Sequence, residues 1–183
     1  MVDSLIKGSK FEESGFYLSD IDALISVLEE LERRKQPTLL LGVSYALLDL
    51  AEKKNIKLRY TNVMETGGMK GRREEMVRSK LHLVLCNGFG VSEIHSEYGM
   101  TELLSQAYSK GNGIFNCPPW MKVQIRDTND PLELLPNGRA GGINVIDLAN
   151  IYSCSFVATQ DLGKTAKNGS FEVIGRFDIG DVR

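Results

Sequence analysis

The pattern of apolar residues changes near Lys110. Before it, short apolar runs of strand type alternate with segments whose apolar residues recur at helical spacing. Such alternation is typical of a mostly parallel sheet with helices packed on it. After it, short strand candidates are separated only by turn signals. We therefore predict an α/β fold in which residues 1–110 form a mostly parallel sheet with flanking helices, and residues 111–183 form a small β subdomain.

The same patterns predict the individual elements. Ser19 followed by Asp22 is typical of a capping box that begins a helix. Helical spacing predicts helices over residues 21–36, 45–55 and 72–87. In the last of these, we expect Leu83 to face the core. Apolar runs predict strands over residues 38–42, 56–65, 91–95, 121–126, 142–146, 153–158 and 171–174.

Composition excludes several classes of partner. The 183 residues include 22 Lys and Arg against 24 Asp and Glu, so a net charge of −2 offers no basic field for nucleic acid or anionic lipid. The most apolar segment, residues 38–51, is too short to span a bilayer. Three cysteines without a CxxC pair favour free thiols in a reducing compartment. We therefore expect a cytoplasmic protein that has no membrane span and does not bind nucleic acid.

The segment Glu97-Tyr98-Gly99-Met100-Thr101-Glu102 combines groups that suit a nucleotide and its metal. An aromatic ring can lie against a base, and a hydroxyl can bond a phosphate oxygen. A carboxylate such as Glu102 can hold Mg²⁺, which prefers hard oxygen ligands together with phosphates. The alternative reading is a strand end followed by a helix cap.

Three further segments carry candidate groups, each with a simpler alternative. Gly67 and Gly68 follow a predicted strand and would let the main chain approach a flat ligand, although they also suit a plain turn. Asp161 could accept hydrogen bonds from vicinal hydroxyls, or it could be a turn residue before Gly163. Arg176 suits ribose or phosphate oxygens, although a surface salt bridge is its ordinary role.

Taken in order along the chain, these segments resemble the nucleotide-site motifs of the adenylate-forming superfamily of acyl ligases. Within it, the sequence most resembles the C-terminal portion of bacterial acyl-protein synthetases, the fatty-acid-activating subunit of the bioluminescence fatty-acid reductase. The motifs that carry this resemblance are Glu65 to Arg72, Ser96 to Glu102, Pro118-Pro119-Trp120, Asp147-Leu148-Ala149-Asn150 and Phe171 to Arg176.

The resemblance implies roles for particular residues. Those expected in binding ATP or AMP are Gly67, Gly68, Tyr98, Gly99, Met100, Asp161 and Arg176. Tyr98 would stack on the adenine that the glycines border, and Asp161 and Arg176 would contact the ribose. The expected catalytic residues are Thr101, at the α-phosphate, and Glu102, which would also hold Mg²⁺. We expect these separated segments to line a single pocket.

The resemblance implies that ATP activates a long-chain fatty acid as an acyl-adenylate, and that the acyl group then passes to a protein thiol. An acyl-accepting protein or a reductase would be the partner. The family's Ser/Thr/Gly-rich phosphate loop is missing from this chain. We therefore expect a split or shortened form that is inactive alone and associates with itself or with a missing N-terminal half. The alternatives are a coenzyme A ligase of phenylacetate type and a non-catalytic assembly subunit of an acyl-processing complex.

Overall fold

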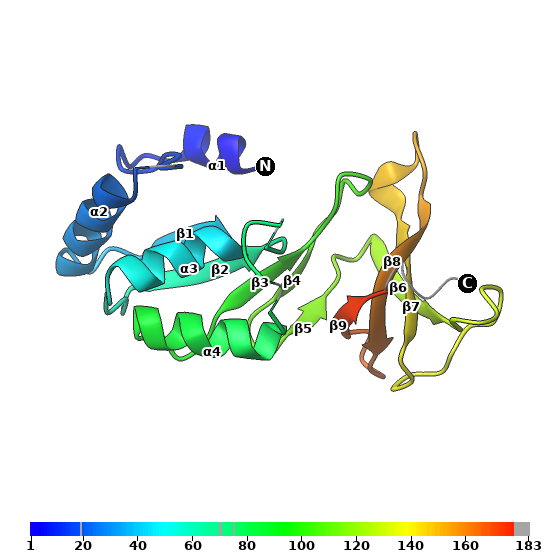
Figure 1. Cartoon of the computed structure of the whole chain (residues 1–183). Helices are drawn as coiled ribbons and strands as arrows, with labels where there is room; N and C mark the ends of the chain where they lie inside the picture. Colours follow the sequence, from blue (N-terminus) through cyan, green and yellow to red (C-terminus); the bar gives the residue numbers. More distant parts are fainter. Residues whose placement is uncertain (19, 70, 75, 178–183) are drawn as a thin grey trace.

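The computed structural model describes residues 1–177 except 19, 70 and 75. Its helices are α1 (Val2–Gly8), α2 (Ile21–Arg33), α3 (Ser44–Lys53) and α4 (Arg78–Phe89), with a single 3₁₀ turn, η1 (Leu148–Asn150). Its strands are β1 (Thr38–Val43), β2 (Thr61–Thr66), β3 (His95–Tyr98), β4 (Ala107–Ser109), β5 (Ile114–Asn116), β6 (Met121–Arg126), β7 (Gly141–Asp147), β8 (Phe156–Thr165) and β9 (Phe171–Arg176). In Figure 1 the helices gather around β1–β3 at one end of the molecule, and β6–β9 form the other end.

All the described strands belong to one sheet, in the order β1-β2-β3-β4-β5-β9-β8-β7-β6. Strands β1, β2 and β3 are parallel, and α3 and α4 connect them. Every pairing from β3 onward is antiparallel. The chain therefore has the predicted α/β character, but the prediction of a mostly parallel sheet is wrong. The reason is that only two helical crossovers are present, and the later strands are joined by hairpins and loops, which pair neighbours antiparallel.

Two short strands and one helix were missed by the sequence patterns. Strands β4 and β5 have three residues each, which is too short to show the alternation that marks a strand. They matter because β5 pairs with β9 and so joins the first three strands to the C-terminal ones. The helix α1 has seven residues and buries none of them. It is too short for its few apolar residues to establish a helical period, which is read over windows of about 11 to 18 residues.

The first hydrophobic core lies between β1–β3 and the helices α2, α3 and α4. Helix α2 begins after Asp20, whose side chain accepts a hydrogen bond from the Ala23 amide at 3.0 Å. The predicted cap residue, Ser19, lies outside the described residues. Asp20 thus fills the N-cap role, which aspartate suits because it satisfies an unpaired amide of the first turn.

Several predicted boundaries shift in this core. The strand predicted over residues 91–95 corresponds to β3, which begins only at His95 and runs to Tyr98. Residues 56–60 precede β2 as irregular chain, because Leu58 donates its amide to the carbonyl of Phe89 instead of to a strand. Helix α4 begins at Arg78, later than predicted, and ends at Gly90, whose φ of 64° closes the last turn. Its buried face is Leu81, Leu85 and Phe89. Leu83 is 62% exposed, so its predicted inward orientation is wrong. It lies two residues from Leu81 and two from Leu85, which places it off the buried face of the helix.

A second hydrophobic core includes Tyr98, Phe115 and Phe171, on β3, β5 and β9, together with apolar residues of β6 and β7. This core begins before residue 110, and the predicted division at residues 110 and 111 stays a prediction. Of the helices that the structure describes, not one combines the length and the apolar character needed to cross a bilayer.

Two strand glycines allow a matched test of packing between β8 and β9. A Cβ on Gly163 would lie 2.4 Å from the carbonyl oxygen of Glu172 and 2.7 Å from Cδ1 of Ile143. A Cβ on Gly175 would meet no atom within 4 Å. We predict that Gly163→Ala lowers the free energy of unfolding by about 2 kcal/mol, since the backbone must shift to admit the methyl group. Urea denaturation checks this, with Gly175→Ala as the control; equal losses in the two variants would contradict it.

Candidate functional site

Three of the predicted site residues meet where the ends of β3 and β9 lie against β8. Tyr98 is the last residue of β3 and Arg176 the last of β9, and Arg176 is the register partner of Asp161 on β8. The Tyr98 hydroxyl donates to Oδ2 of Asp161 at 2.8 Å. Nε of Arg176 lies 3.3 Å from Oδ1 of the same carboxylate. Residues separated by 63 positions in the sequence thus form one polar cluster, which we name the Asp161 cluster.

The second hydrophobic core holds Tyr98 of the Asp161 cluster in place. The Tyr98 ring packs edge-to-face on Phe115 and Phe171, at centroid distances of 6.0 and 5.4 Å. This ring is only 7% exposed. Burial raises the pKa of the Tyr98 hydroxyl, and the negative charge and hydrogen bond of Asp161 raise it further. The hydroxyl therefore stays protonated and acts as a fixed donor to Asp161.

The carboxylate of Asp161 keeps capacity for a ligand. Among residues 1–177, as far as they are described, each of its oxygens has one side-chain partner, Tyr98 or Arg176, and a carboxylate oxygen can accept two hydrogen bonds. Arg176 is 71% exposed on its side chain, so it can move toward a bound anion without leaving a buried site. The arrangement suits a ligand that presents hydroxyls to Asp161 and an oxygen-rich group to Arg176.

The glycine turn lies at the edge of the sheet where β3 also ends. Thr66, the last residue of β2, is the parallel register partner of Glu97, so Gly67 leaves the sheet beside Tyr98. Gly67 has φ of 68°, a conformation that favours glycine, and its carbonyl accepts a hydrogen bond from Ser44 Oγ at 2.9 Å. Gly68 follows it and is exposed. The structure thus brings the glycine turn next to the strand that carries Tyr98.

The remaining predicted residues form the turn after β3. Met100 packs on the second core, whereas Gly99, Thr101 and Glu102 are exposed. Within the described part of the chain, no group of three His, Cys, Asp or Glu side chains could hold a metal ion. Glu102 can therefore supply one oxygen to Mg²⁺, whose other ligands would be phosphate and water. A single exposed carboxylate is compatible with a Mg²⁺ ion that binds together with the nucleotide.

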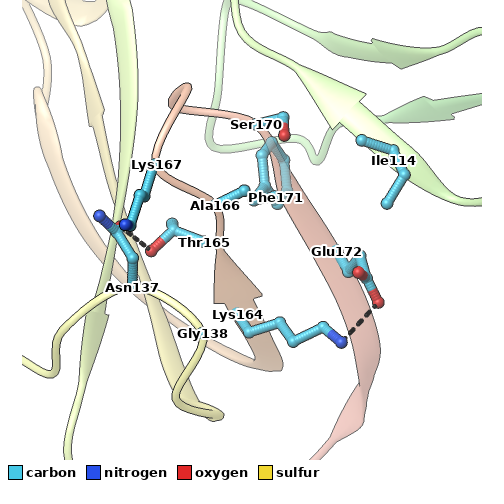
Figure 2. Close-up of a pocket in the computed structure, with 10 residues that line it drawn as sticks. All are labelled: Ile114, Asn137, Gly138, Lys164, Thr165, Ala166, Lys167, Ser170, Phe171 and Glu172. Carbon is cyan, nitrogen blue, oxygen red and sulfur yellow. Dashed lines mark hydrogen bonds and ion pairs between the residues drawn. The ribbon is translucent and has the colours of Figure 1, made fainter.

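Two cavities of the structure lie away from the predicted site residues. One cavity of about 330 Å³ lies between the β6–β7 connection and the hairpin of β8 and β9, where Lys164 pairs with Glu172 at 3.2 Å (Figure 2). A second, of about 360 Å³, lies along the start of β2. Neither cavity is lined by a predicted site residue. The single pocket expected from the sequence stays a prediction.

A buried polar network next to the glycine turn was missed from sequence. Glu65 on β2 is 1% exposed, and its carboxylate lies 3.1 Å from Ser44 Oγ, 3.4 Å from Nε of Arg78 and 3.5 Å from Nε2 of His82. Burial by itself raises the pKa of Glu65, but hydrogen bonds from His82 and Ser96 and the positive charges outweigh it and lower the pKa. The signal in the sequence was a carboxylate at an inward strand position, which must find partners.

Comparisons with known proteins give the fold of this chain. No protein-family model matches it, and no curated protein matches its sequence. It is similar to the ATP-bound structure of MatB from Rhodopseudomonas palustris, with 19% identity, a TM-score of 0.59, and 83% of this chain aligned to 33% of that one. It is also similar to O-succinylbenzoate coenzyme A synthetase (MenE) from Bacillus subtilis in complex with AMP, with 22% identity, a TM-score of 0.55, and coverage of 84% and 34%.

A third similar structure is a benzoate coenzyme A ligase from Burkholderia xenovorans LB400, with 17% identity, a TM-score of 0.55, and coverage of 85% and 34%. This chain thus spans about one third of the length of the structures that it matches. It shares its fold with part of each of these structures. The predicted resemblance is thus supported at the level of the fold alone.

The Glu65 network predicts a pH-dependent stability. Because the folded pKa of Glu65 is lowered, its stabilising contribution is present above the unfolded pKa and is lost as pH falls through the folded one. We predict that Glu65→Gln lowers the free energy of unfolding by about 2 kcal/mol at neutral pH, since Arg78 and His82 lose a charged partner. The deficit should shrink in acid, where the wild-type carboxyl is protonated too.

Urea denaturation of both proteins at neutral and acid pH measures this deficit. Glu12→Gln, at an exposed position, is the control and should change stability little at either pH. A deficit of the same size at both pH values would contradict the ionic role of Glu65.

Proposed function

We propose that this chain supplies the ribose- and α-phosphate-binding part of the site of an adenylate-forming acyl ligase. The observation that carries the proposal is the Asp161 cluster, in which a carboxylate with spare acceptor capacity is held by Tyr98 and Arg176. Ribose hydroxyls are vicinal donors, and a charged acceptor binds such donors more strongly than a neutral one does.

The adjoining strand ends suit the rest of the nucleotide. The Gly67-Gly68 turn lies beside β3 and would border the adenine. With its ring 7% exposed, Tyr98 offers the base little free surface, and we assign it chiefly to orienting Asp161. Gly99 and Met100 lead the chain to Thr101, whose exposed hydroxyl would bond the α-phosphate. Glu102 would hold Mg²⁺, which when bound offsets phosphate charge.

In the proposed reaction, a carboxylate oxygen of a fatty acid attacks the α-phosphorus of ATP. The bond from that phosphorus to pyrophosphate breaks, which gives an acyl-adenylate. This chain contributes by positioning the nucleotide and stabilising charge. Contacts to the β- and γ-phosphates would come from a second polypeptide segment or from a second copy of this chain. We place the reaction in the cytoplasm.

The acyl group is proposed to pass to a protein thiol, as the resemblance to acyl-protein synthetases implies, with release of AMP. Coenzyme A as acceptor is the second candidate, because two of the structures with a similar fold are a coenzyme A synthetase and a coenzyme A ligase. Labelling with radioactive fatty acid and ATP separates these acceptors: label on protein supports the first, and label on coenzyme A supports the second.

The nucleotide site is tested by calorimetry of this chain with AMP. We predict that Asp161→Asn weakens AMP binding about tenfold, because one hydrogen bond to a charged group contributes about 1.5 to 3 kcal/mol. Asp130→Asn, in the turn between β6 and β7, is the matched control and should bind like the wild type. Absence of AMP binding by the wild type would refute the proposal and favour a non-catalytic assembly role.

A further inference from the structure

The side chain of Asn150, in η1, holds the main chain on both sides of Leu103. Its Nδ2 donates to the carbonyl oxygen of Glu102 at 2.6 Å, and its Oδ1 accepts from the amide of Leu104 at 2.8 Å. Asn150 is buried. These two bonds fix the peptide that leaves Glu102, one of the residues expected at the metal and phosphates.

Asp147, at the start of the same turn, binds the following residue of that segment, Ser105. Its Oδ2 accepts from the Ser105 amide at 2.9 Å, and its Oδ1 accepts from Ser105 Oγ at 2.7 Å and from the Ala149 amide at 3.0 Å. Trp120 Nε1 in turn donates to Ser105 Oγ at 2.8 Å. Asp147 therefore bonds both its own turn and the segment after Glu102.

Asp147 is 0% exposed, and among the described residues no cation lies within salt-bridge distance of it. A buried carboxylate held only by hydrogen bonds is costly, whereas an apolar residue there would carry no such penalty. The carboxylate instead gives conformational specificity, since its oxygens fix one conformation of the Ser105 main chain. Packing alone therefore does not explain why the Asp147-Leu148-Ala149-Asn150 motif places polar side chains at buried positions.

We propose that Asp147 and Asn150 are positioning residues for Thr101 and Glu102, and we call their two side chains the clamp. This inference rests on the proposed function, because it assigns the clamp to the phosphate end of the same nucleotide. Thr101 and Glu102 are exposed and make an otherwise open turn. The clamp restrains the chain on their C-terminal side, while Tyr98 restrains it on the other side within the second core. The hydroxyl of Thr101 is thereby held before any phosphate arrives.

The clamp predicts a difference between two ligands. Adenosine would contact the Asp161 cluster and the Gly67-Gly68 turn, whereas AMP would also reach Thr101. Asn150→Ala should weaken AMP binding about tenfold and leave adenosine binding unchanged, since one oriented contact to a charged phosphate contributes about 1.5 kcal/mol or more. Calorimetry of the chain with each ligand measures this ratio, which a general loss of stability would not produce.

Leu148→Ala is the matched control, because Leu148 lies in the same turn and is 55% exposed. It should leave both affinities unchanged. Circular dichroism checks folding, and if Asn150→Ala does not fold, Ser105→Ala removes the hydroxyl contact to Asp147 and should show the same selective loss.

The outcomes separate the two proposals. A wild-type chain that binds neither adenosine nor AMP overturns the proposed function and the clamp together. A wild-type chain that binds both, with variants that lose both ligands equally or neither, overturns the clamp alone. Equal affinity of the wild type for adenosine and AMP also overturns it, because Thr101 then makes no phosphate contact.

Discussion

The contact among the rings of Tyr98, Phe115 and Phe171 is the interaction on which the arrangement of this molecule depends. These rings come from β3, β5 and β9, so their packing joins the parallel strands to the antiparallel ones. Phe115 and Phe171 are also register partners, which fixes β9 beside β5. With β9 in place, β8 follows and carries Asp161 to the hydroxyl of Tyr98. A hydrophobic contact thus determines where a polar cluster forms.

Near that contact, buried polar side chains fix the conformation of the exposed turns. Glu65 lies under the Gly67-Gly68 turn and bonds Ser44, whose hydroxyl also reaches the Gly67 carbonyl. Asp147 and Asn150 hold the turn that follows β3. Each network restrains a loop at the edge where β2 and β3 end. Loops carry ligands well when a rigid scaffold positions them, and this edge has that form.

The sequence named the residues of the Asp161 cluster as site candidates, but it did not predict their contacts with one another. Asp161 and Arg176 follow from motif order, but their meeting with Tyr98 depends on the β5–β9 pairing, and a three-residue strand such as β5 shows no readable period. For the same reason the antiparallel character of the sheet was not predicted. The turn-separated strands β6, β7 and β9 were predicted close to their observed bounds, because asparagine, glycine and proline mark their ends. Strand β8 was predicted over residues 153–158, whereas it runs from Phe156 to Thr165. The sequence did not predict the network around Glu65, since its partners lie on the helices α3 and α4 and leave no local pattern beside it.

The central claim is that the Asp161 cluster binds the ribose of an adenine nucleotide. A crystal structure of this chain with AMP tests it most directly. The account predicts ribose hydroxyl oxygens about 3 Å from the Asp161 carboxylate and the phosphate beside Thr101. AMP seated instead in the cavity near Lys164 and Lys167, or elsewhere with Asp161 untouched, would contradict it.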